Sequence, residues 1–173
     1  MIIMRHVFII IIGILPSLCF AKGDYLTDDQ FLARIFPERS EQPQALWLNA
    51  SIKNEISQIL THEYNGLRVR YWRSGSRTAW IFNEIGKELP ITIGVGVDQN
   101  QVMQIEILSF RESRGGEVRY PFFRDQFQGV SLADDHRLSK TIDGISGATM
   151  SVRAVSRVTR LALYLHQLAL VEK

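Results

Sequence analysis

A change of hydrophobic period near residue 67 constrains the fold of this chain more than any other feature. Before it, apolar residues recur at helical spacing, whereas from there to residue 110 they largely alternate with polar residues, as in half-buried β-strands. Four strand-like runs follow one another with short turns between them, over residues 67–73, 78–85, 91–97 and 102–110. Consecutive strands with short connections pair as neighbours, so the pattern predicts an antiparallel meander.

Helices are expected on both sides of these strands in the sequence. Residues 26–37, capped by Thr27, and residues 50–60 have helical periodicity, and the polar stretch 38–46 is expected to connect them. Residues 121–127 indicate a short helix and residues 151–171 a long amphipathic one, with Arg153, Arg157 and Arg160 facing outward. Trp80, Phe122 and Phe123 are expected in the core. The prediction is an α+β fold, a twisted antiparallel sheet of about four strands with one side covered by helices, including a long C-terminal helix.

The length of 173 residues suits one compact domain and a leader. We expect a signal peptide over residues 1–21, an N-terminal helical segment over 22–66 and the main domain over 67–173. The composition, 46% hydrophobic and 22% charged, is that of a soluble globular protein. The net charge is +2, and basic residues are scattered among acidic ones, so a nucleic acid partner is not expected.

The first 21 residues resemble an export signal. Arg5 precedes an apolar run over residues 7–15, and small residues stand at Cys19 and Ala21, which predicts cleavage after Ala21 and a periplasmic location. The alternative is an uncleaved membrane anchor, although a span needs about 20 apolar residues and this run is shorter. A lipid on Cys19 is a further possibility, which Leu18 before it fits poorly.

Loss of the leader removes the only cysteine of the chain. Disulfides, thiolate-bound clusters and a cysteine nucleophile are then excluded. His62, His136 and His166 lack the spacing of metal ligands, so no metal site is predicted, and no serine has a recognisable base and acid. Redox chemistry in this chain would therefore need a bound organic cofactor.

The segment from Asp143 to Ser151, which reads DGISGATMS, carries the most chemical information. Ser146, Gly147 and Ala148 are small, so a ligand can approach the backbone closely. A helix that begins just after them presents free N–H groups and the positive end of its dipole, which suit a phosphate. Without further information the same residues would be an ordinary loop and helix cap.

The run Asp-Gly-Ile-Ser-Gly-Ala-Thr resembles the flavinylation motif of the FMN-binding domain found in the C and G subunits of sodium-pumping NADH:quinone reductases and Rnf-type complexes. The resemblance implies FMN joined to Thr149 by a phosphoester, and a magnesium-dependent flavin transferase that uses FAD as the donor. Asp143 is then either a recognition point for the transferase or the cap of a turn.

A second segment implied by the resemblance is a loop after two strands, near the isoalloxazine. Glu112, Ser113 and Arg114, followed by Gly115 and Gly116, occupy that place. The respiratory subunits usually read Glu-Thr-Pro-Gly-Leu-Gly, so Arg114 and Gly116 depart from their pattern. Glu112 and Arg114 either contact the flavin or its phosphate, or form a solvated charged turn.

These features predict an exported electron-transfer module rather than a self-sufficient enzyme. The flavin would exchange electrons with a membrane or periplasmic redox partner, and the protein would hold it and set its electrostatic environment. No catalytic residues are predicted. One alternative is a flavin-dependent reductase with its own substrate, and another is a binding or sensory module that stays unflavinylated.

Overall fold

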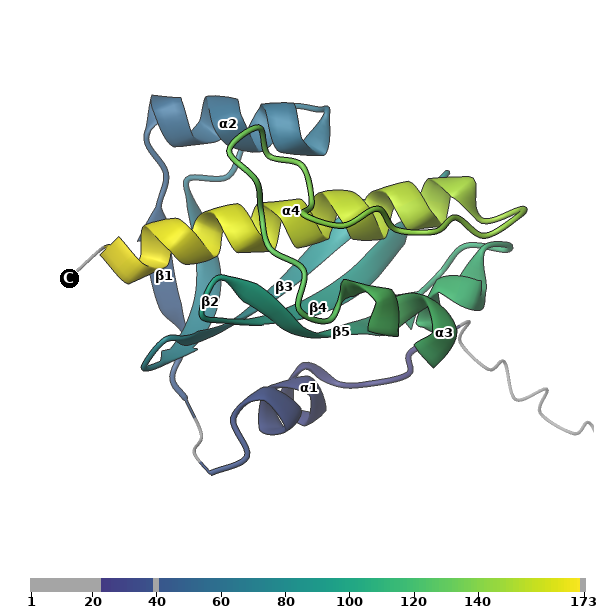
Figure 1. Ribbon diagram of the computed structural model, residues 1–173, viewed down its shortest axis with the longest axis horizontal. Helices are drawn as coiled ribbons and strands as arrows, with labels where there is room; N and C mark the ends of the chain where they lie inside the picture. The colour runs from purple at the N-terminus through teal and green to yellow at the C-terminus, as the bar shows by residue number, and fades with distance from the viewer. Residues whose placement is uncertain (1–22, 39–40, 172–173) are drawn as a thin grey trace, which may run out of the picture.

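The computed structural model describes residues 23–38 and 41–171, and the predicted signal peptide lies outside them. Five antiparallel strands form one sheet in the order of the chain (Figure 1). The strands are β1 (Gln44–Trp47), β2 (Arg68–Ser74), β3 (Arg77–Ile85), β4 (Pro90–Asp98) and β5 (Gln101–Phe110). The helices are α1 (Asp28–Ile35), α2 (Ala50–Leu60), α3 (Pro121–Arg124) and α4 (Thr149–Val171), with 3₁₀ turns at Gly116–Arg119 and Asp125–Phe127. The predicted α+β meander and long C-terminal helix are confirmed.

Strand β1 lies where the sequence suggested only a connection. It pairs with β2 from Gln44 opposite Tyr71 to Trp47 opposite Arg68, and only Leu46 of its four residues is buried. A strand this short shows too little alternation to be told from a polar loop. It adds a fifth strand to the predicted four.

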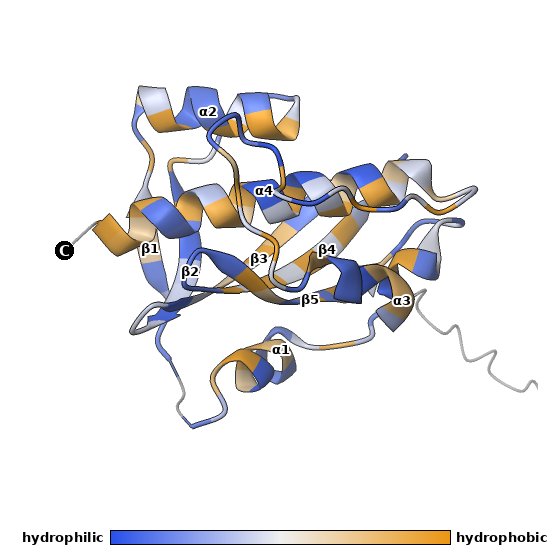
Figure 2. Cartoon of the chain, in the orientation of Figure 1, coloured by the Kyte–Doolittle hydropathy of each residue, from blue (hydrophilic) through white to orange (hydrophobic). Residues whose placement is uncertain are grey.

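One face of the sheet carries the main core. Helix α4 lies along this face and α2 packs against α4, and Figure 2 shows hydrophobic and hydrophilic bands alternating along α4. Trp80 is fully buried there and stacks on Tyr71 with 5.0 Å between the ring centroids. Phe123 is also buried, whereas Phe122 is 61% exposed, contrary to expectation.

The opposite face is covered by α1, so helices do not cover one side only (Figure 1). Phe31 and Ile35 of α1 pack with Trp72, Ala79 and Leu108 in a second apolar cluster. Successive strand residues point to opposite faces, which is why Tyr71 and Trp72 belong to different clusters. As predicted, Thr27 caps α1, and it does so through a capping box with Gln30.

Two arginines of α4 that were expected to face solvent contact other elements instead. Arg157 donates from Nε to the buried Glu84 of β3 at 2.9 Å, and His62 lies 3.1 Å from the same carboxylate. Arg160 donates to the carbonyl oxygen of Ile59 at 3.2 Å, which ties α4 to α2. Helical periodicity correctly placed them on the side of α4 away from the sheet core, but α2 and the end of β3 also contact that side. Arg153 is exposed, as predicted.

Residues just before α1 run along the free edge of β5. Phe110 donates its N–H to the carbonyl oxygen of Gly23, and Tyr25 donates its N–H to that of Leu108, both at 2.8 Å. Between them, Asp24 and Ser109 form an isolated antiparallel β-bridge. Residues on both sides of the predicted boundary at 66/67 thus join the same sheet. No helix within the described ranges is long and apolar enough to cross a membrane.

Candidate functional site

Helix α4 begins at Thr149, the threonine singled out in the sequence. Gly147 has a φ of +80°, a backbone conformation that favours glycine, and the next residue, Ala148, donates its N–H to the carbonyl oxygen of Ile145 at 3.0 Å. Val152 donates to the carbonyl oxygen of Ala148, so the N–H groups of the first turn have no partner within the helix. Thr149 is exposed while Ala148 is buried. This local turn therefore presents a hydroxyl to solvent at the positive end of a helix of 23 residues.

The loop that follows β5 packs directly against this helix start. Gly115 has a φ of +86°, and a Cβ at this position would lie 2.5 Å from Oγ of Ser151 and 3.5 Å from Cα of Ala148. Only glycine combines that backbone conformation with that separation. The two segments singled out in the sequence are thus adjacent in the fold.

Glu112 is turned into the protein and holds the loop between β3 and β4. Its Oε1 accepts backbone N–H groups from Lys87, Glu88 and Leu89, at 2.5, 2.6 and 2.9 Å, and the residue is only 9% exposed. Burial raises the pKa of the Glu112 carboxyl, but these three N–H groups and the charge of Lys87 outweigh burial, so its net pKa is lowered. Glu112 is therefore not a solvated turn residue, whereas its contact with the flavin or its phosphate stays a prediction.

Two neighbouring grooves open around these segments. The first, of about 470 Å³, is lined by Lys87, Glu88, Glu112, Ser113, Arg114 and residues 147–151, including Thr149. The second, of about 350 Å³, is lined by residues 113–117, Arg119, Tyr120, Ser146 and Gly147. They share Ser113, Arg114 and Gly147. Their volumes fall within the range of small-molecule sites, and we call the two together the Thr149 cavity.

Most of the predicted site residues meet at this cavity. Glu112, Ser113, Arg114, Ser146, Gly147, Ala148 and Thr149 all line it. Asp143 does not; its backbone N–H binds the side-chain oxygen of Gln126 at 2.7 Å, and no bond from its carboxylate is found within the described part of the chain. The structure adds Lys87, Arg119 and Tyr120, which belong to no motif and reach the cavity only through the fold.

The cavity carries positive charge at its rim. Arg114 is exposed and makes no hydrogen bond or ion pair with any other described residue, and Lys87 pairs only with the exposed Glu88, at 3.1 Å. Exposed pairs of this kind are weak, so both cations remain available to an anion beside Thr149. The exposed hydroxyl, the close backbone approach at Gly147 and these cations together fit a phosphate-bearing ligand.

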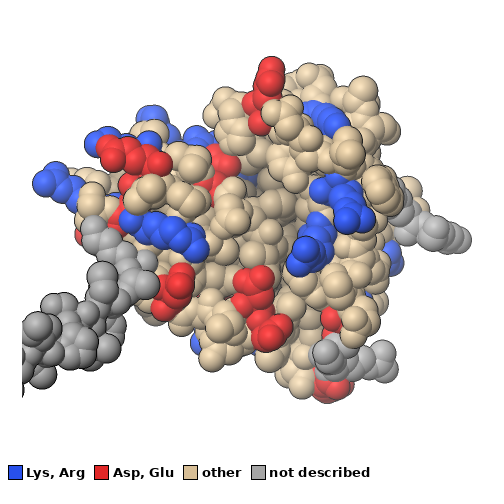
Figure 3. Space-filling model, turned by 180° about the vertical axis from the view of Figure 1, so that it is seen from behind, with Lys and Arg blue, Asp and Glu red and all other residues tan. Residues whose placement is uncertain are grey.

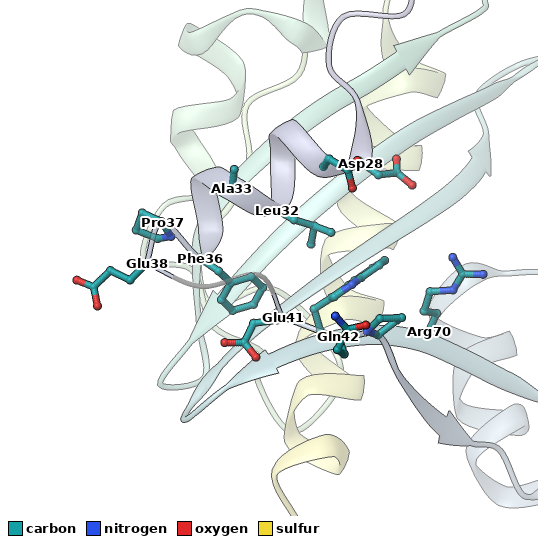
Figure 4. A pocket seen from close by; sticks show the side chains of 12 residues that line it. Asp28, Leu32, Ala33, Phe36, Pro37, Glu38, Glu41, Gln42 and Arg70 are labelled. Atoms are coloured by element: carbon teal, nitrogen blue, oxygen red, sulfur yellow. The ribbon is translucent and has the colours of Figure 1, made fainter.

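A larger cavity of about 680 Å³ lies elsewhere, between α1, residues 41–43 just before β1, and the middle of β2. Figure 4 shows Glu38 and Glu41 at one end of it and Asp28 and Arg70 at the other. Four carboxylates against one arginine would repel a phosphate, so its size does not make it the better site. The molecular face turned away in Figure 1 is hollowed and carries both charge signs interspersed (Figure 3).

The histidines of the described chain have separate partners. His62 contacts Glu84, His136 lies 3.6 Å from Glu55, and His166 bonds Thr78. No three potential metal-ligating side chains of the described residues come together.

Comparison with known families decides the class of the site. Residues 86–164 match the family model of the FMN-binding domain. This region is an FMN-binding domain. Every residue that lines the two grooves lies within it. The elements from Gly23 through the end of β3 precede the match, although they complete the sheet on which the domain is built. A comparison with curated proteins gives no match.

Proposed function

We propose that FMN is attached covalently to Thr149 by a phosphoester and that the domain acts as an electron-transfer module. The observation that carries the proposal is the position of the Thr149 hydroxyl, which is exposed in the 470 Å³ groove of an FMN-binding domain. Lys87 and Arg114 lie at the same groove and would neutralise the phosphate. The small Ser146-Gly147-Ala148 segment leaves room beside it.

FMN would supply the redox chemistry, and the chain would contribute orientation and electrostatics. A tethered cofactor suits a protein outside the cytoplasm, where lost FMN is not readily replaced. We therefore propose export through the leader, loading by a magnesium-dependent flavin transferase, and electron exchange with a membrane or periplasmic partner.

The test is co-expression of the full chain with an active flavin transferase. The wild-type protein should fluoresce as a flavoprotein on a denaturing gel, and its intact mass should rise by one FMN less one water. Thr149→Val keeps the shape of the side chain but has no hydroxyl, so it should remain colourless.

Ser146→Ala is the matched control, because Ser146 is also exposed and lies three residues away in the same segment. It should load as the wild type does. Wild-type protein that stays unmodified beside an active transferase would refute covalent attachment and favour an unflavinylated binding module. Loading that persists in Thr149→Val but disappears in Ser146→Ala would move the attachment point.

A further inference from the structure

Arg119 is held between two tyrosines at the rim of the Thr149 cavity. Its Nη1 donates to the hydroxyl of Tyr25 at 2.6 Å and its Nη2 to that of Tyr120 at 2.7 Å. Its guanidinium carbon lies 4.9 and 4.8 Å from the centroids of the same two rings. A guanidinium fixed by two hydrogen bonds and two cation–π contacts loses much of the mobility of an exposed arginine.

Tyr25 is itself anchored by the backbone. It donates its N–H to the carbonyl oxygen of Leu108 in β5. Two residues earlier, Gly23 accepts the N–H of Phe110, which holds the chain before Tyr25 against the same strand. Gly23 has a φ of +77°, and a Cβ there would lie 2.4 Å from the carbonyl oxygen of Phe110. The N-terminal segment thus sets the place of the Tyr25 ring, although it lies outside the family match.

The held guanidinium lines the 350 Å³ groove together with Arg114 and Glu117. This groove meets the Thr149 groove at Ser113, Arg114 and Gly147. Thr149 lines the first groove and the second adjoins it, so a flavin tethered at Thr149 can extend from the one into the other. Two arginines against one carboxylate give the second groove a positive balance, which favours the reduced and more negative form of a flavin.

We propose that Arg119 is a fixed cation beside the flavin and that Tyr25 is a positioning residue acting through it, so that the N-terminal segment raises the reduction potential of the bound cofactor. This inference rests on the proposed attachment at Thr149. It assigns a role in the cofactor site to a residue that precedes the FMN-binding domain.

The test is spectroelectrochemistry on protein whose flavin content has first been established by mass. Arg119→Gln should lower the potential by about 30 mV, which corresponds to a tenfold change in the two-electron equilibrium. Arg119→Lys, which keeps the charge, should recover most of the wild-type value. Tyr25→Phe keeps the ring but loses the hydroxyl, and should lower the potential by a smaller amount.

The double variant separates positioning from a direct effect. If Tyr25 acts through Arg119, then Tyr25→Phe combined with Arg119→Gln should match Arg119→Gln alone. Arg68→Gln is the control, since Arg68 also lies over an aromatic ring, that of Trp47, but at the opposite edge of the sheet. It should leave the potential unchanged.

Fully loaded Arg119→Gln with the wild-type potential, or Arg119→Lys no closer to wild type than Arg119→Gln, would overturn the fixed-cation role. Additive shifts in the double variant would overturn the positioning role of Tyr25. In each case the loaded mass shows that one FMN is still covalently attached. A wild-type protein that fails to load would instead refute the proposed function.

Discussion

Replacing Glu112 by glutamine should weaken the fold at the loop that borders the Thr149 cavity. The substitution keeps an acceptor oxygen and nearly the same shape, but it removes the negative charge that three backbone N–H groups share. A hydrogen bond to a charged group is worth about 1 kcal/mol more than a neutral one. Since the three bonds share one oxygen they are not additive, and we expect a loss of about 2 kcal/mol in the free energy of unfolding.

Urea denaturation at neutral pH measures this loss, and Glu88→Gln is the matched control. Glu88 lies on the same loop with an exposed side chain, so its replacement should cost under about 0.5 kcal/mol. The lowered pKa of Glu112 adds a second signature, because its contribution is present at neutral pH and is lost as the pH falls through its folded-state value. The deficit of Glu112→Gln should therefore shrink in acid. Equal stabilities for the two variants at neutral pH would refute the role of the Glu112 carboxylate in stabilising the β3–β4 loop.

Two further predictions concern the packing around the site and the far end of α4. Gly115→Ala should lower the free energy of unfolding by about 2 kcal/mol and reduce flavin loading. Gly129 has a φ of +74° but open space around its Cβ, so Gly129→Ala should cost only the backbone strain of about 1 kcal/mol. Equal losses for the two variants in urea denaturation would show that contact with Ser151 is unimportant. Burial lowers the pKa of His166 to about 4, so the neutral ring stabilises the fold fully above about pH 6.5, and this stability should fall by up to about 3 kcal/mol as the pH drops to 4. Unfolding free energies across this range should fall less steeply in His166→Gln, and parallel curves would contradict the assignment.

The sequence predicted those parts of the fold whose patterns are long. Strands β2 to β5 and helix α4 each extend over several repeats of their period, and so they were located to within a few residues. Strand β1 has four residues with one buried side chain, which leaves almost no periodic signal. The place of α1 on the second face follows from contacts with Trp72 and Leu108, distant in the sequence.

The candidate site divides in the same way. The segment around Thr149 and the loop around Glu112 are each an unbroken run of sequence, so each was visible as a motif. The orientation of Glu112 was not, because it depends on where the β3–β4 loop ends up relative to β5. Lys87 reaches the first groove, and Tyr25 reaches Arg119 of the second, only because the sheet brings distant parts of the chain together.

The pairing of residues 23–26 with β5 also affects the order in which the molecule can be completed. A chain is synthesised from its N-terminus, so Gly23 and Tyr25 are made first, yet their partners lie on the last strand of the sheet. Contacts so distant in sequence form late, because the entropy of ordering the intervening chain is lost before the contacts can stabilise the fold. Until then β5 has an open edge, the kind of surface on which chains associate wrongly. Deleting residues 23–26 from the N-terminal side should therefore promote aggregation during folding as well as disturb the cavity.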